Sequence, residues 1–147
     1  MTDDEVVRQQ LIALLRGGNA HLNFERAVSQ FPLDYINRKV SPISYSPWEL
    51  LEHMRICQWD ILEFIRNPQY KSPPWPKGYW PAKGESADEN KWKKTLSNFR
   101  ADLSSAENFL GDSSTNLYQP IPHAPEYNLF REILLARRAE YHGLARG

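Results

Sequence analysis

The sequence contains a single cysteine, Cys57, so no disulfide can form within the chain. It also has no excess of charge of either sign, because its 18 basic residues equal its 18 acidic ones. Without a basic field, the surface offers little to hold a nucleic-acid backbone or an anionic membrane. A lone cysteine in an apolar pattern fits a reducing compartment. We therefore expect a cytoplasmic protein that binds neither nucleic acid nor membrane.

Long hydrophobic runs are missing as well. No uncharged apolar stretch of the chain approaches the roughly 20 residues of a membrane span, and the first five residues are mostly acidic. Glycine-rich phosphate loops, paired CxxC cysteines and nucleophile elbows are absent too. At 147 residues the chain has the length of one domain. We expect residues 1–147 to fold as a single unit.

Four segments carry apolar residues at the spacing of one helix face. They cover residues 3–30, 47–66, 87–111 and 129–144. In the first, Gly17-Gly18 predicts a kink or a close approach by another backbone or a ligand, because glycine disfavours a helix interior. No segment shows the alternation typical of strands. The pattern predicts an all-α protein, a four-helix bundle whose long connections permit crossovers and leave the helix order open.

Local capping signals support three of these helix starts. Ser46 and Glu49 have the spacing of a capping box, and Pro47 stands at the first helical position. Ser86 and Glu89 repeat the same spacing. Asn128 is suited to cap the last helix.

The connection over residues 67–85 is rich in proline and aromatic residues, among them Tyr70, Trp75, Tyr79 and Trp80. A loop this long in a small domain is usually functional or packed by its own side chains. We interpret it as a lid over one end of the bundle. The alternative is that its rings fill the gap made by a crossover between helices.

Three histidines occur in the predicted helices, namely His21, His53 and His142. His53 falls on the apolar face of its helix, beside Cys57. A buried imidazole must form a hydrogen bond, bind a metal or stay neutral at a cost in free energy. The alternative to a metal site is an ordinary core histidine with satisfied hydrogen bonds. His123 lies in an irregular segment and is predicted to be a solvated loop residue.

Four segments together resemble one protein family. They are residues 17–21 (GGNAH), 46–53 (SPWELLEH), 75–81 (WPKGYWP) and 129–135 (LFREILL). Over nearly its whole length the chain resembles the DinB-like family of small four-helix metalloenzymes. This family includes YfiT-like proteins and relatives of the bacillithiol and mycothiol transferases.

The resemblance implies a divalent metal, nickel or zinc, bound by one histidine of the second helix and an HxxxH pair of the last. His53 matches the first ligand, and His142, preceded by Tyr141, matches the second histidine of the pair. Arg138 stands where the other histidine is expected, and Arg137 replaces the expected aspartate. A guanidinium has no lone pair to donate, so Arg138 cannot serve as a ligand.

His21 is then the candidate third metal ligand, and Arg138, Tyr141 and Trp80 are candidates for substrate binding. The first functional hypothesis is a metal-dependent enzyme, either a hydrolase or a thiol-linked transferase acting on a small molecule. The second is a metal-free module, binding or regulatory, that holds an organic anion through Arg138 or Arg137. The two arginines would otherwise be cations that complement a helix dipole. We expect a homodimer in either case.

Overall fold

The computed structural model describes residues 1–17 and 23–145, with side chains described up to Arg137. This part of the chain is mostly helical, which confirms the predicted all-α class at that level. Its helices are α1 (Asp3–Arg16), α2 (Phe24–Val28), α3 (Pro47–Arg66), α4 (Glu89–Gly111) and α5 (Leu129–Ala145). Short 3-10 turns, η1 (Leu33–Tyr35) and η2 (Lys77–Tyr79), and two strands, β1 (Pro120–Ile121) and β2 (Ala124–Asn128), complete the structure.

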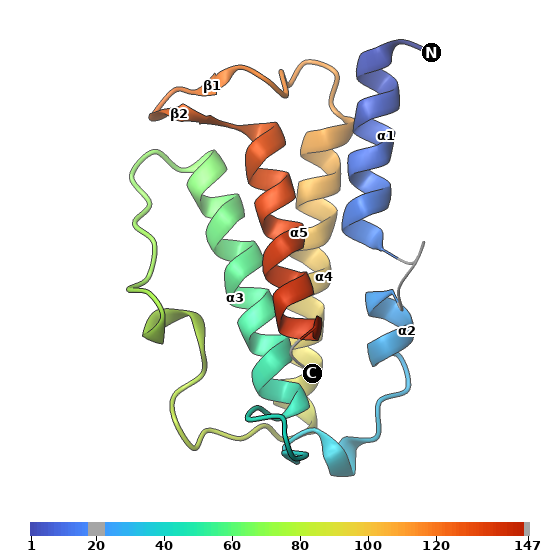
Figure 1. Cartoon of the computed structure of the whole chain (residues 1–147), viewed down its shortest axis with the longest axis vertical. Helices are drawn as coiled ribbons and strands as arrows, with labels where there is room; N and C mark the ends of the chain where they lie inside the picture. The colour runs from blue at the N-terminus through green and yellow to red at the C-terminus, as the bar shows by residue number, and fades with distance from the viewer. Residues whose placement is uncertain (18–22, 146–147) are drawn as a thin grey trace.

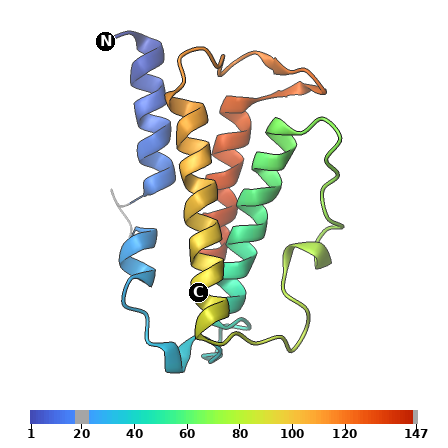
Figure 2. The same cartoon turned by 180° about the vertical axis from the view of Figure 1, so that it is seen from behind.

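The four long helices lie side by side with their axes roughly aligned (Figure 1). Helix α3 packs against α4 and α5, and α1 packs against the same two helices. Seen from behind, α4 runs between α1 and α3 (Figure 2). Helices α3 and α5 run in opposite directions, so the start of α3 lies near the end of α5 (Figure 1).

The core is formed by apolar faces of these four helices. One cluster joins all four and includes Leu11, Leu15, Ile61, Leu62, Ala106, Leu110, Leu117, Leu129, Ile133 and Ala136. A second cluster lies around the start of α3 and is formed by Ile36, Trp48, Leu51, Ala87, Trp92 and Leu96. Within it the indole of Trp48 donates to the Thr95 hydroxyl at 3.3 Å, so the buried ring nitrogen is satisfied.

The predicted helix starts are confirmed at α3 and α5 and corrected at α4. Ser46 and Glu49 form the predicted capping box. The Asn128 side chain accepts a hydrogen bond from the backbone N–H of Arg131 at 2.8 Å. Helix α4 is capped by Asp88 instead of Ser86, because the Asp88 carboxylate accepts from the backbone N–H of Lys91.

The prediction of one kinked helix over residues 3–30 is wrong. Helix α1 ends at Arg16, and Gly17 follows with a φ of 71°, a backbone conformation that favours glycine and ends a helix. A Cβ at Gly17 would lie 3.4 Å from the guanidinium of Arg137, so the group that comes close there is a side chain and not the predicted backbone or ligand. His21 belongs to residues 18–22, which lie outside the described part of the chain.

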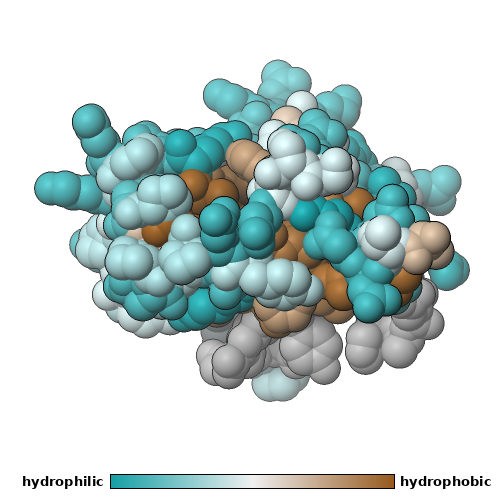
Figure 3. Space-filling model, turned by 90° about the horizontal axis from the view of Figure 1, so that it is seen from above, coloured by the Kyte–Doolittle hydropathy of each residue, from teal (hydrophilic) through white to brown (hydrophobic). Residues whose placement is uncertain are grey.

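Two connections also differ from the prediction. The irregular segment before α5 contains the antiparallel pair β1–β2, which is too short to show alternation in the sequence. The connection after α3 does not close one end of the bundle but runs back along the length of α3 (Figures 1 and 2). At the end that carries the strands, hydrophilic side chains surround smaller hydrophobic areas (Figure 3). No described helix combines the length and hydropathy required to cross a membrane.

Arg8 joins α1 to the carboxyl end of α4. Its buried guanidinium pairs with Asp4 at 2.6 Å and donates to the backbone carbonyls of Leu110, Asp112 and Thr115. The last carbonyls of a helix have no partners within the helix. Arg8 therefore satisfies the carbonyl of the buried Leu110, whereas the carbonyl of Asp112 also accepts from the backbone N–H of Thr115.

We predict that Arg8→Ala lowers the free energy of unfolding by about 2–4 kcal/mol, because it removes three hydrogen bonds to backbone carbonyls and leaves the carbonyl of the buried Leu110 without this donor. The matched control is Arg16→Ala, whose guanidinium pairs with Glu107 at the exposed surface and should cost less than about 1 kcal/mol. Urea unfolding of both variants measures the difference. Equal losses would contradict the assigned role of Arg8.

Candidate functional site

His53 lies in the second turn of α3, on the side that faces the connection to α4. Its side chain is buried, with 7% of its surface exposed, as its place on the apolar face predicts. The helix begins only six residues earlier at Pro47, where the capping box fixes its start and therefore its rotation. The sequence thus places this imidazole inside the protein through local signals alone.

One ring nitrogen of His53 has a defined partner. Nδ1 lies 2.7 Å from the backbone carbonyl oxygen of Tyr79. A carbonyl oxygen only accepts hydrogen bonds, so Nδ1 must carry the proton and donate. In the neutral ring, Nε2 then keeps its lone pair. The burial of His53 lowers its pKa, an effect that the hydrogen bond to Tyr79 partly opposes. The ring is therefore neutral at pH 7.

The face of the imidazole is covered by Trp80. The two rings are stacked, with centroids 3.8 Å apart and planes inclined by 4°. Tyr45 stacks on the same indole at 4.0 Å, from the loop that precedes α3. Trp80, a predicted substrate-binding residue, therefore does lie beside His53. It forms a wall of the site and restricts the rotation of the imidazole.

A tight turn in the connection brings Tyr79 and Trp80 to α3. The backbone N–H of Gly78 donates to the carbonyl of Pro74 at 2.7 Å. A Cβ on Gly78 would lie 2.5 Å from Cβ of Pro73 and 2.9 Å from Cδ of Pro74, so a side chain there has no room. Glycine at this position lets the chain fold onto the prolines and turn the next carbonyl toward His53.

Asp60 lies two turns beyond His53 on α3 and is also buried. Its two carboxylate oxygens accept hydrogen bonds from the hydroxyls of Tyr70 at 2.9 Å and Tyr79 at 2.8 Å. Burial and the bond to Asp60 raise the pKa of Tyr79 to about 12. The hydroxyl of Tyr79 therefore stays protonated and continues to donate.

Glu132, in the first turn of α5, is a second buried carboxyl group, with 3% of its surface exposed. Burial raises its pKa, the ion pair with Arg131 lowers it, and the charge of Asp60 raises it further. The helices that carry these two acids, α3 and α5, pack against each other. The face of α3 that carries His53 thus also carries one buried acid, Asp60, and the neighbouring helix α5 carries another.

Cys57 lies between His53 and Asp60 on the same face of α3 and is buried. Its sulfur is 3.8 Å from each ring nitrogen of His53. An atom equally far from both nitrogens does not lie along the lone pair of Nε2, which points away from Nδ1 in the ring plane. Cys57 therefore packs beside the imidazole without blocking that nitrogen.

The other predicted site residues lie outside the part of the chain whose side chains the structure describes. His21 belongs to residues 18–22, and the side chains of Arg138, Tyr141 and His142 lie beyond the last described side chain, although α5 extends to Ala145. His123 is not solvated as predicted, since its Nε2 lies 2.6 Å from the carbonyl oxygen of Phe64 and the residue is half-buried.

The sequence analysis missed Asp60, Glu132 and the carbonyl of Tyr79. Asp60 could have been found from its spacing, because a residue seven positions after His53 shares its helix face. Glu132 stands among apolar residues in a predicted core helix, which is the other available signal. The role of the Tyr79 carbonyl leaves no trace in the sequence, because every residue has such a group.

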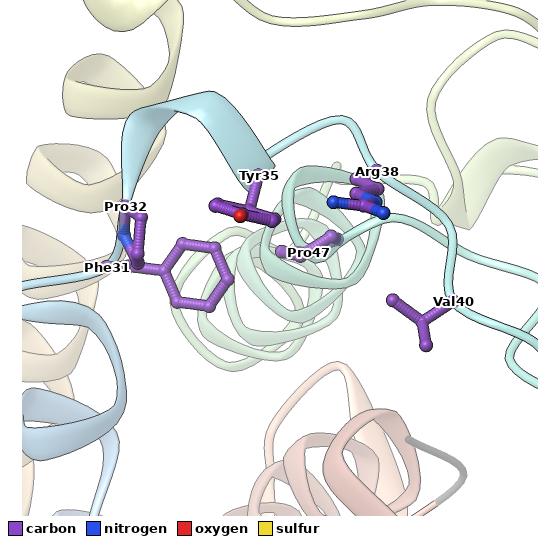
Figure 4. A pocket seen from close by; sticks show the side chains of 6 residues that line it. All are labelled: Phe31, Pro32, Tyr35, Arg38, Val40 and Pro47. Atoms are coloured by element: carbon purple, nitrogen blue, oxygen red, sulfur yellow. The ribbon is translucent and has the colours of Figure 1, made fainter.

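A separate pocket of about 380 Å³ lies at the start of α3. Its lining is apolar apart from the guanidinium of Arg38, and consists of Phe31, Pro32, Tyr35, Arg38, Val40 and Pro47 (Figure 4). Arg38 lies 5.2 Å from the centre of the Tyr35 ring. None of the residues that line this pocket is an acid, histidine or cysteine, so it offers no chemistry comparable to that around His53.

Within residues 1–17 and 23–137, no group of three or more histidine, cysteine, aspartate or glutamate side chains is arranged to hold a metal ion. His53 has the chemistry of a metal ligand, because its Nε2 keeps a lone pair. Comparisons with protein-family models, with curated proteins and with solved structures find no match for this chain.

We predict that the pKa of His53 lies below the usual histidine value of about 6.5. Because the folded protein resists protonation of this ring, stability should be lost as the pH falls from about 6.5 through the lower pKa of the folded state. NMR titration of the ring protons measures the pKa directly. His53→Gln should flatten the fall in stability, and a midpoint above 6.5 would refute the prediction.

Proposed function

We propose that this protein is a DinB-like four-helix bundle that acts as a metal-dependent enzyme on a small molecule, with His53 as a ligand of nickel or zinc. The reaction would be a hydrolysis or a thiol-linked transfer. The observation that carries the proposal is the hydrogen bond from Nδ1 of His53 to the carbonyl of Tyr79. Histidines that bind metals typically donate their other ring N–H to a carbonyl or carboxylate, which fixes the tautomer.

The burial of the ring supports the same proposal. A metal ligand must be unprotonated, and burial lowers the pKa of His53. The stack on Trp80 holds the ring plane, so Nε2 has a defined direction. An ordinary core histidine would gain from hydrogen bonds at both nitrogens, whereas here, among the described side chains and backbone, Nδ1 has a close oxygen partner and Nε2 has the Cys57 sulfur at 3.8 Å.

The register of the two helices favours His142 as the second ligand. Helices α3 and α5 pack against each other and run in opposite directions, so the start of α3 lies near the end of α5. His53 lies in the second turn of α3, and residue 142 lies in the last turn of α5. Both residues therefore belong to the same end of this helix pair.

The bound metal would supply one piece of chemistry, which is to lower the pKa of a coordinated water or thiol. The residues of the chain would do the rest. Trp80 would shield the ligand from bulk water, and Tyr79 would keep Nε2 of His53 unprotonated. His21 would complete the site, because Arg138 cannot donate a lone pair. A cytoplasmic homodimer remains part of the proposal.

The alternative is a metal-free module that binds an organic anion through Arg137 or Arg138. The specific observation in its favour is the position of Arg137, whose guanidinium lies close to Gly17 at the end of α1 and places a positive charge near the junction of α1 and α5.

We predict that zinc or nickel binds the purified protein at micromolar concentration and that His53→Ala removes this binding, because it deletes the ligand. Calorimetry and elemental analysis measure affinity and stoichiometry. His142→Ala should have the same effect, and Arg138→His should strengthen binding by restoring the missing imidazole.

The matched control is His123→Ala, which removes another half-buried histidine that is bonded to a backbone carbonyl. This variant should bind metal as the unchanged protein does. If the His53→Ala variant contains as much metal as the unchanged protein, His53 is not a metal ligand. If only Arg138→His binds metal, the natural protein is the metal-free module.

A further inference from the structure

Tyr79 is attached to α3 at two points. Its backbone carbonyl oxygen accepts from Nδ1 of His53 at 2.7 Å, and its hydroxyl donates to Oδ2 of Asp60 at 2.8 Å. His53 and Asp60 are seven residues apart, which places them on one helix face about 10 Å from each other along the axis. A single residue of the connection therefore spans two turns of α3.

The contacts of Tyr79 with His53 and Asp60 form a link between these two residues, and the end of the link at Asp60 is fixed. The Asp60 side chain is buried, and its other oxygen, Oδ1, accepts from the hydroxyl of Tyr70 at 2.9 Å. A carboxylate with a donor on each oxygen has little freedom to rotate. The hydroxyl of Tyr79 is therefore bound to an acceptor whose position is set by α3 itself.

The link is stiff between its two ends. Tyr79 closes the 3-10 turn η2 through its backbone N–H, which donates to the carbonyl of Pro76 at 3.1 Å. Gly78 in the same turn lies in contact with Pro73 and Pro74. Because the aromatic ring and the carbonyl belong to one residue in a packed turn, a shift of the ring moves the carbonyl.

We propose that Asp60 is a positioning residue for His53 and acts through Tyr79. By holding the Tyr79 hydroxyl, Asp60 keeps the Tyr79 carbonyl against Nδ1 of His53, and Nε2 keeps its lone pair as a result. The next residue, Trp80, is held against the imidazole face by the same anchor. The inference rests on the proposed function only in naming Nε2 as the metal-binding nitrogen.

Two tyrosines provide a matched pair of variants. Tyr79→Phe and Tyr70→Phe each remove one hydroxyl that donates to Asp60, and Tyr79→Phe also removes the hydrogen bond between this hydroxyl and Ser72. Only Tyr79 carries the carbonyl that His53 contacts. A purely structural role of Asp60 would make the two variants equivalent, whereas positioning would make them differ at His53.

The first readout is the Nδ1–H proton signal of His53 in the metal-free protein. It should persist in Tyr70→Phe, and it should broaden or vanish in Tyr79→Phe as the hydrogen bond loosens and the proton exchanges with water. The second readout is zinc affinity, which should weaken about 10-fold or more in Tyr79→Phe and less than about 3-fold in Tyr70→Phe. Urea unfolding of both variants measures the loss of global stability and separates it from the change at His53.

Asp60→Asn tests the anchor itself, because the amide group replaces one acceptor oxygen by a donor. It should reproduce the effect of Tyr79→Phe on the His53 signal. An unchanged signal in both of these variants, or equal changes in Tyr79→Phe and Tyr70→Phe, would overturn the inference. The Nδ1–H signals can behave as expected while neither the unchanged protein nor any variant binds zinc. In that case Asp60 does position His53, and the proposal of a metal-dependent function is wrong.

Discussion

The burial of one imidazole constrains the structure around it. A ring on the apolar face of α3 requires a partner for its polar atoms, and the protein supplies the carbonyl of Tyr79 at 2.7 Å. The connection after α3 must therefore return along the helix instead of leaving it. The tight turn at Gly78, the stack of Trp80 and the bonds to Asp60 all follow from holding this segment against α3.

Features set by local chemistry could be predicted from the sequence. The capping box at Ser46 fixed the start of α3, and Asn128 fixed that of α5. Predictions were wrong where the same local sequence is compatible with two helix boundaries. Asp88 caps α4 two residues after the predicted Ser86, since either side chain can accept a backbone N–H. The break after Arg16 was underestimated, because the glycines at 17 and 18 suit a helix end as well as a kink.

For the site, periodicity could place His53 inside the protein but could not identify its partner. Its contacts come from a segment 26 residues away whose path depends on proline and glycine packing. The aromatic residues of that segment indicated that it packs on something, and the structure shows that Tyr70, Tyr79 and Trp80 contact α3. His21, Arg138, Tyr141 and His142 remain predictions, since their side chains lie outside the described part of the chain.

The assignment of His53 as a metal ligand and the positioning role of Asp60 both depend on which ring nitrogen of His53 carries the proton. The most direct test is to measure the ¹⁵N chemical shifts of both ring nitrogens in the metal-free protein at pH 7. The structure predicts a protonated Nδ1 and an unprotonated Nε2 with its lone pair available. A neutral ring protonated at Nε2 would contradict the hydrogen bond to Tyr79, and both the ligand assignment and the role of Asp60 would be lost.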